Sequence, residues 1–127
     1  MAKRILVVDD DAQVLSYLVD VLTSAGYETA AFRRFEDARA HLNANRPDLM
    51  LVDIRLGVFN GLQLALFLKD KYPDVPAFVL TGYEDPTLRS EAANLGLQYL
   101  TKPLGTADLL RSVAGAFSPP GAANAAR

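Results

Sequence analysis

Short apolar runs along the chain alternate with longer segments in which apolar residues recur every three or four positions. The runs at residues 5–8, 49–52 and 77–80 are continuous and apolar, which is typical of strands that are buried on both faces of a sheet. Two weaker runs, at 28–32 and 98–101, are interpreted as further strands. The pattern therefore predicts five strands, the third of which ends at Asp53.

The segments between these strands have the apolar spacing of helices. In the first segment the apolar positions run from Val14 to Ala25, with Asp11 as the expected cap and Gly26 as the expected stop. Thr106 can cap a last helix that reaches Phe117. The helices between them are predicted at residues 35–45, 62–71 and 86–95, and residues 54–60 are interpreted as a loop before Gly61.

Strand and helix thus alternate five times, which predicts a parallel sheet with helices on both faces. The expected fold class is α/β: a five-stranded parallel sheet of order 2-1-3-4-5, in a flavodoxin-like, doubly wound (βα)5 three-layer sandwich. We assign residues 1–117 to this domain. Residues 118–127, with Pro-Pro-Gly followed by alanines, are expected to form a flexible tail.

Composition excludes several kinds of site. The 127 residues include no cysteine and one histidine, so neither a disulfide framework, a thiolate zinc site nor a multi-histidine metal cluster is available. The net charge of -2 and the lack of a basic run argue against direct binding of nucleic acid. The apolar start is too short for a signal peptide, and no segment has the length of a membrane-spanning helix, so we expect a cytoplasmic protein without membrane contact.

Polar residues follow four of the five predicted strands. Asp9 and Asp10 follow the first, Asp53 ends the third, Thr81 follows the fourth and Lys102 follows the fifth. In the order 2-1-3-4-5 the carboxyl ends of these strands meet in one crevice, the usual ligand site of such sheets. Three carboxylates together need a cation or a raised pKa, and an all-oxygen donor set favours Mg²⁺. A carboxylate beside Mg²⁺, a lysine and a hydroxyl is a plausible phosphoryl acceptor.

Five motifs in this order resemble the receiver domain of two-component response regulators, over about residues 3–117. They are Val7-Val8-Asp9-Asp10, Leu51-Val52-Asp53, Gly61, Leu80-Thr81-Gly82 and Tyr99-Leu100-Thr101-Lys102-Pro103. The resemblance implies that Asp53 is the phospho-acceptor. It also implies that Asp9, Asp10, Asp53 and the main-chain carbonyl of Arg55 bind Mg²⁺, and that Thr81 and Lys102 contact the phosphoryl group. Thr81 and Tyr99 would form the switch, and the Lys102–Pro103 bond would be cis.

The resemblance also implies a set of partners. A histidine kinase or a histidine phosphotransfer protein would supply the phosphoryl group. A downstream protein target, or a second copy of the chain, would bind the face formed by the fourth helix, the fifth strand and the last helix. Arg89, Tyr99 and Arg111 are the candidate residues on this face.

The chain departs from the family pattern after the acceptor. Leu56-Gly57 stands where the family most often has Met-Pro, so this loop is expected to be more mobile. Arg55 and Tyr83 occupy positions that influence how long the phosphoryl group persists in the family.

Other functions fit part of the pattern. The chain could be a phosphate sink that drains a kinase, a fragment of a multidomain regulator, or a receiver-shaped binding module without phosphorylation. A Mg²⁺-dependent phosphohydrolase resembling the haloacid-dehalogenase group would need an aspartate where Arg55 stands. We therefore expect no catalysis beyond phosphorylation and dephosphorylation of Asp53 itself. A flavodoxin-like cofactor carrier is disfavoured because three aspartates after the first strand would repel a phosphate. His41 is expected to face solvent.

Overall fold

The computed structural model describes residues 2–82 and 85–117 of the chain. Its main sheet contains the strands β1 (Arg4–Val8), β2 (Glu28–Phe32), β3 (Leu49–Asp53), β6 (Ala77–Thr81) and β7 (Gln98–Thr101). The helices are α1 (Ala12–Ser24), α2 (Phe35–Ala44), α3 (Gly61–Lys71), α4 (Pro86–Asn94) and α5 (Thr106–Phe117). Two short strands, β4 (Arg55–Leu56) and β5 (Phe59–Asn60), form a separate hairpin between β3 and α3.

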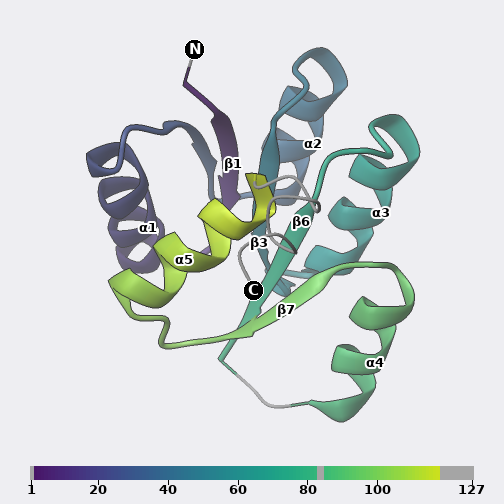
Figure 1. The fold of residues 1–127 in the computed structure, drawn as a ribbon. Helices are drawn as coiled ribbons and strands as arrows, with labels where there is room; N and C mark the ends of the chain where they lie inside the picture. Colours follow the sequence, from purple (N-terminus) through teal and green to yellow (C-terminus); the bar gives the residue numbers. More distant parts are fainter. Residues whose placement is uncertain (1, 83–84, 118–127) are drawn as a thin grey trace, which may run out of the picture.

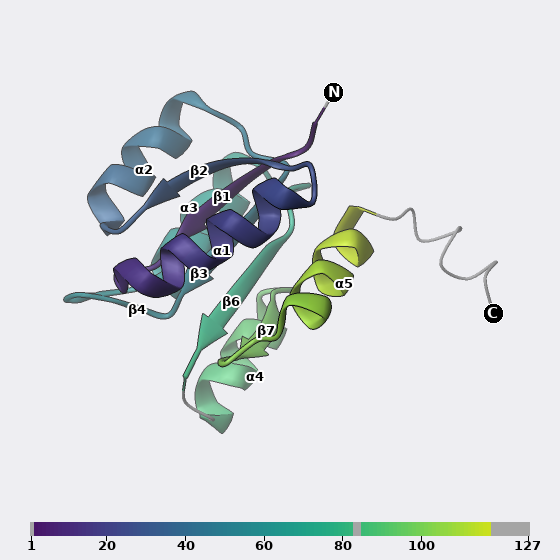
Figure 2. The same ribbon diagram turned by 90° about the vertical axis from the view of Figure 1, so that its left-hand side faces the viewer.

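The main sheet has the order β2-β1-β3-β6-β7, and every neighbouring pair of strands is parallel. β4 and β5 lie outside this sheet, so β6 and β7 are its fourth and fifth strands in chain order. The spatial order of the sheet is therefore 2-1-3-4-5, as predicted. Figure 1 shows α1 and α5 on one side of the sheet and α2, α3 and α4 on the other. Figure 2 shows the same layers with α1 and α5 in front of the strands.

Alternate residues of the central strands supply two separate cores. Along β1, Ile5 and Val7 pack under α1 and α5, while Leu6 and Val8 pack under α2, α3 and α4. All five residues of β3 are buried, and so are all five of β6. This double burial explains why both strands are continuous apolar runs in the sequence rather than alternating ones.

The helix ends agree with most of the predicted signals. The Asp11 side chain caps α1 by accepting hydrogen bonds from the main-chain N–H groups of Gln13 and Val14. Gly26 follows the end of α1 with φ +97°, a conformation that side chains with a Cβ rarely adopt. The prediction for Thr106 was wrong, because this residue is the first of α5 rather than its cap. Its hydroxyl instead lies 3.0 Å from the hydroxyl of Tyr17.

Residues 54–60 are more regular than the predicted loop. Arg55 pairs with Asn60 and Leu56 with Phe59 in an antiparallel hairpin whose two-residue turn begins with Gly57 at φ +63°. A glycine at the first turn position is favoured in such hairpins. The departure from Met-Pro therefore produces a defined turn in this segment.

Gly61, at the start of α3, lies against the main chain of β3. A Cβ atom built on Gly61 would overlap the carbonyl oxygen of Asp53 and lie 3.1 Å from the Cα of Ile54. Close packing against the main chain of β3 therefore requires glycine at position 61.

Among the described residues, no helix combines the length and the apolar character needed to cross a membrane.

We predict that Gly61→Ala lowers the free energy of unfolding by about 2 kcal/mol or more, because the backbone atoms that it meets cannot move aside cheaply. Urea unfolding would measure this loss. Gly115→Ala is the matched control, since a Cβ at this exposed position of α5 meets nothing within 4 Å. In a helix this control should raise stability by about 0.5–1 kcal/mol. Equal effects of the two substitutions would contradict the packing explanation.

Candidate functional site

Three carboxylates meet where β1 and β3 end. Val8 of β1 pairs with Val52 of β3, so the residues that follow, Asp9 and Asp53, lie at neighbouring strand ends. Oxygen atoms of Asp9, Asp10 and Asp53 all lie within 4.8 Å of one another. Asp9 is fully buried and Asp53 is 7% exposed, while Asp10 is exposed. The fold thus brings together the three acidic residues that the sequence placed in one crevice.

Lys102, which follows β7, reaches into this acidic cluster. Its Nζ atom lies 2.7 Å from Oδ2 of Asp9 and 3.4 Å from Oδ1 of Asp53. The main-chain N–H of Lys102 donates to the carbonyl of Thr81 at 2.7 Å, which fixes the lysine to the end of β6. The Lys102–Pro103 peptide bond is cis, as the resemblance implies.

Asp9 has both carboxylate oxygens engaged. Oδ2 accepts from Lys102, and Oδ1 accepts from the main-chain N–H of Asp11 at 3.0 Å. A fully buried carboxylate needs such partners, since an unpaired buried charge is costly. Asp10 supplies the solvent-facing side of the cluster, where a ligand could enter.

Burial, and to a smaller extent the nearby charge of Asp9, raise the pKa of Asp53 from 3.8 to about 6. The charge of Lys102 and a hydrogen bond from the main chain of Arg55 act in the opposite direction but do not compensate fully. The Asp53 carboxylate therefore lies in an environment that disfavours its charged form. A bound cation would stabilise that form.

Burial by itself would lower the pKa of Lys102. The hydrogen bond to Asp9 and the charges of Asp53 and Asp9 outweigh that effect, so the pKa of Lys102 lies above its ordinary value. Lys102 is therefore charged at neutral pH.

Thr81 and Tyr99 lie on the same face of the sheet. Thr81 is buried at the end of β6, and Val79, two residues earlier, pairs with Tyr99 of β7. Because residues two apart on a strand share a face, Thr81 and Tyr99 are diagonal neighbours under α4. The Arg89 guanidinium lies 4.5 Å from the centre of the Tyr99 ring, which links α4 to β7.

The other predicted site residues are more dispersed. Arg111 is exposed on α5, where it pairs with Asp108 at 3.0 Å. Arg55 is exposed on β4, and its main chain donates a hydrogen bond to Asp53. Tyr83 lies outside the described residues. The expectation that His41 faces solvent was partly wrong, because its half-buried ring packs 5.0 Å from the ring of Phe32.

Sequence reasoning missed Arg33, which follows β2 at the same end of the sheet. Its Nε and one terminal nitrogen donate to the main-chain carbonyl of Asp10 at 3.3 and 3.2 Å. The available signal was its position, since β2 is the neighbour of β1 and Arg33 directly follows its last residue.

The donor set fits a hard divalent cation. All of its atoms are oxygens, the cluster carries an excess of negative charge, and Asp10 leaves it open to solvent. Such ligands are preferred by Mg²⁺ rather than by softer metals.

Comparisons with known proteins agree with this geometry. Residues 5–114 match the family model described as the response regulator receiver domain. The chain is 31% identical, over 91% of its length, to the DNA-binding transcriptional regulator NtrC of Proteus hauseri, of which it covers 24%. The curated relatives that head the comparison are all longer, and the chain spans between about a quarter and about a half of their lengths.

Solved structures share the whole fold. A response regulator receiver domain protein (CheY-like) from Methanospirillum hungatei JF-1 superposes with a TM-score of 0.87 at 28% identity, covering 91% of this chain and 93% of that one. The beryllofluoride-activated NtrC4 receiver domain dimer gives a TM-score of 0.84 at 25% identity, with 90% and 95% covered.

The raised pKa of Asp53 predicts a pH dependence of stability in the absence of metal. The folded state holds the Asp53 proton more tightly than the unfolded state does, so this contribution to stability is present at low pH. It is lost as the pH rises from about 4 to about 7, by at most about 3 kcal/mol for a pKa raised from 3.8 to about 6. Urea unfolding in EDTA at several pH values would measure it. Asp53→Asn should lack this contribution, and identical pH profiles of the two proteins would contradict the shift.

Proposed function

The chain belongs to the response regulator receiver family, and on this premise we propose that it is a phosphorylation-dependent signalling module of a two-component or phosphorelay system. A histidine kinase or a histidine phosphotransfer protein would donate a phosphoryl group to Asp53. The observation that carries the proposal is the convergence of Asp9, Asp10 and Asp53 within 4.8 Å, with the Lys102 ammonium 3.4 Å from Asp53.

The proposed reaction is the attack of an Asp53 carboxylate oxygen on phosphorus. A new oxygen–phosphorus bond forms, the bond from phosphorus to the donor nitrogen breaks, and an acyl phosphate results. Asp9, Asp10, Asp53 and the main-chain carbonyl of Arg55 would hold Mg²⁺, which neutralises charge on the phosphoryl oxygens. Lys102, whose Nζ lies 3.4 Å from Oδ1 of Asp53, would contact one phosphoryl oxygen, and the Thr81 hydroxyl would donate a hydrogen bond to another.

The added charge on Asp53 would then act on the face formed by α4, β7 and α5. Thr81 would move toward the phosphoryl group and vacate space beside its diagonal neighbour Tyr99. Because Arg89 packs on the Tyr99 ring, a movement of this ring changes α4 as well. Together with Arg111, these residues form the proposed contact face for a downstream protein or for a second copy of the chain.

We propose no turnover of outside substrates. Arg55 occupies the position at which a haloacid-dehalogenase-like phosphohydrolase would carry its second aspartate. Phosphorylation and hydrolysis of the Asp53 acyl phosphate would be the only reactions. A role as a phosphate sink uses the same chemistry and differs only in having no downstream target.

A cytoplasmic location is part of this proposal. It is supported by the apolar residues 5–8, which belong to the inner strand β1 and pair with β2 and β3 rather than forming a cleavable segment.

We predict that incubation with acetyl phosphate and Mg²⁺ adds a single phosphoryl group to the protein. Intact mass spectrometry would detect the adduct, and EDTA should abolish it. Asp53→Asn should remain unmodified, because an amide cannot form the acyl phosphate. Asp11→Asn is the control, since Asp11 caps α1 and is not among the three clustered carboxylates. An adduct on the Asp53→Asn protein would identify a different acceptor, and no adduct on the wild type would refute the proposed chemistry.

We further predict that phosphorylation changes the amide chemical shifts of α4, β7 and α5, and that Thr81→Ala takes up the phosphoryl group but loses most of these changes. The reason is that Thr81 links the phosphoryl group to Tyr99. Two-dimensional NMR of the phosphorylated wild type and Thr81→Ala would measure these shifts. The amides of α2, on the same side of the sheet as α4, serve as the internal reference. Equal changes in Thr81→Ala and wild type would contradict the proposed switch.

A further inference from the structure

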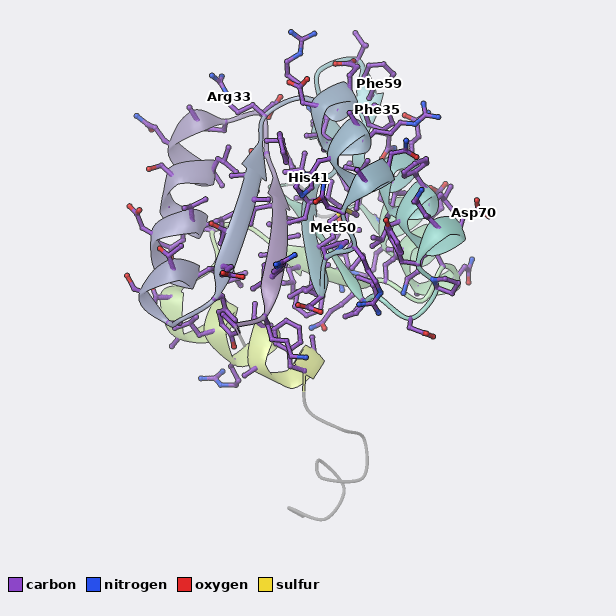
Figure 3. The ribbon with its side chains drawn as sticks, turned by 90° about the horizontal axis from the view of Figure 1, so that it is seen from above. Arg33, Phe35, His41, Met50, Phe59 and Asp70 are labelled. Atoms are coloured by element: carbon purple, nitrogen blue, oxygen red, sulfur yellow. The ribbon has the colours of Figure 1, made fainter. Side chains whose placement is uncertain are left out.

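The corner between β2 and α2, at residues 32–35, carries none of the expected site residues, yet it contacts both loops that supply the metal ligands. Figure 3 shows Arg33 on the same side of the molecule as the neighbouring rings of Phe35 and Phe59. The first loop, residues 9–11, carries Asp9 and Asp10. The second is the β4–β5 hairpin, which carries Arg55.

The first loop is held from β2 by two kinds of contact. The main-chain N–H of Asp9 donates to the carbonyl of Phe32 at 3.1 Å, which continues the ladder of the sheet. The Arg33 guanidinium then donates two hydrogen bonds to the carbonyl of Asp10, at 3.3 and 3.2 Å. Of these contacts, only that of Arg33 comes from a side chain.

The second loop is held by an aromatic stack. The ring of Phe35, the first residue of α2, lies parallel to the ring of Phe59 with 4.4 Å between their centres and 12° between their planes. Phe59 pairs with Leu56 across the hairpin, and Leu56 is only 3% exposed. The stack therefore holds β5, and β5 pairs with β4, the strand that carries Arg55.

We propose that Arg33 and Phe35 form a clamp that positions Asp10 and Arg55 for Mg²⁺. This inference rests on the proposed function and adds two positioning residues to it. Asp10 is exposed and repelled by Asp9 and Asp53, and the contacts of Arg33 with its carbonyl oppose a movement of Asp10 toward solvent. Holding the loop in advance reduces the ordering that metal binding requires, as outer contacts of metal ligands commonly do.

The sign of the effect separates positioning from simple charge. Arg33 is a cation near an acidic cluster, so through its charge alone it would oppose Mg²⁺, and its removal would tighten binding. If Arg33 acts by holding the Asp10 carbonyl, its removal weakens binding. Lysine retains the charge but lacks the fork that donates two hydrogen bonds to one oxygen.

The test is the Mg²⁺ dissociation constant, measured by isothermal titration calorimetry. We expect Arg33→Ala to bind Mg²⁺ about tenfold more weakly, and Arg33→Lys to bind it more weakly than the wild type. Arg34→Ala is the matched control, because Arg34 is the adjacent cation and pairs with Glu36 at 3.4 Å instead. Unchanged or tighter binding by Arg33→Ala would overturn the role of Arg33.

The second arm of the clamp is tested with Phe35→Leu, which keeps an apolar side chain but removes the stack. We expect it to weaken Mg²⁺ binding several-fold. Phe117→Leu is its control, since it removes the half-buried pair with Tyr27, 5.7 Å between ring centres, from another part of the fold. Equal Mg²⁺ affinities of Phe35→Leu and Phe117→Leu would overturn the role of Phe35.

Thermal unfolding in EDTA distinguishes positioning from a loss of structure. A merely structural role would lower the melting temperature in EDTA and leave the Mg²⁺ affinity of the folded protein unchanged, which would overturn the clamp. Failure of the proposed function would look different. In that case the wild type itself would neither bind Mg²⁺ nor accept a phosphoryl group, whereas failure of the clamp leaves both properties intact in Arg33→Ala.

Discussion

Mutual repulsion of Asp9, Asp10 and Asp53 is the constraint on which the rest of this site depends. The register of β1 against β3 places Asp9 and Asp53 at adjacent strand ends, and burial removes the water that would screen them. Lys102 offsets part of the repulsion from the opposite side, with its ammonium 2.7 Å from Asp9. The remaining imbalance appears as the pKa of Asp53, raised to about 6 by burial and by Asp9. Binding of a cation beside the three carboxylates would therefore lower the electrostatic free energy of the site.

The two hydrophobic cores of the domain offset the destabilising repulsion among the three carboxylates. β3 and β6 are buried along their whole lengths, with one set of side chains under α1 and α5 and the other under α2, α3 and α4. The acidic cluster lies at the carboxyl ends of β1 and β3 rather than within either core. Close packing also restrains the main chain of Asp53, since Gly61 allows α3 to approach the Asp53 carbonyl. Asp53 thus lies on a main-chain segment that tolerates little movement.

The sequence predicted the strands of the main sheet and the residues at their ends. It did not predict features that depend on tertiary contacts or on very short strands. Three continuous apolar runs and two weaker ones identified the five strands of the main sheet. The expected order of these strands brought Asp9, Asp53 and Lys102 to one edge. The hairpin at residues 54–60 was missed, because its two strands are only two residues long and have no apolar period to detect. Arg33 was missed because an exposed arginine has no distinctive pattern, and only the fold shows that its guanidinium meets the carbonyl of Asp10.

Phosphorylation of Asp53 would invert the balance of charges that the unmodified site displays. Lys102 is now closer to Asp9, at 2.7 Å, than to Asp53, at 3.4 Å, so Asp9 holds the ammonium more closely. A phosphoryl group brings a charge of about -2 to the Asp53 side and extends it toward solvent. The phosphoryl group would then compete with Asp9 for the ammonium of Lys102 and would offer an acceptor to the Thr81 hydroxyl. Because the main chain of Lys102 is bonded to Thr81 at the ends of β7 and β6, both responses arise at the same strand ends. Tyr99 is the diagonal neighbour of Thr81, and Arg89 packs on the Tyr99 ring. A change at these strand ends is therefore expected to alter the face that contains Tyr99 and Arg89.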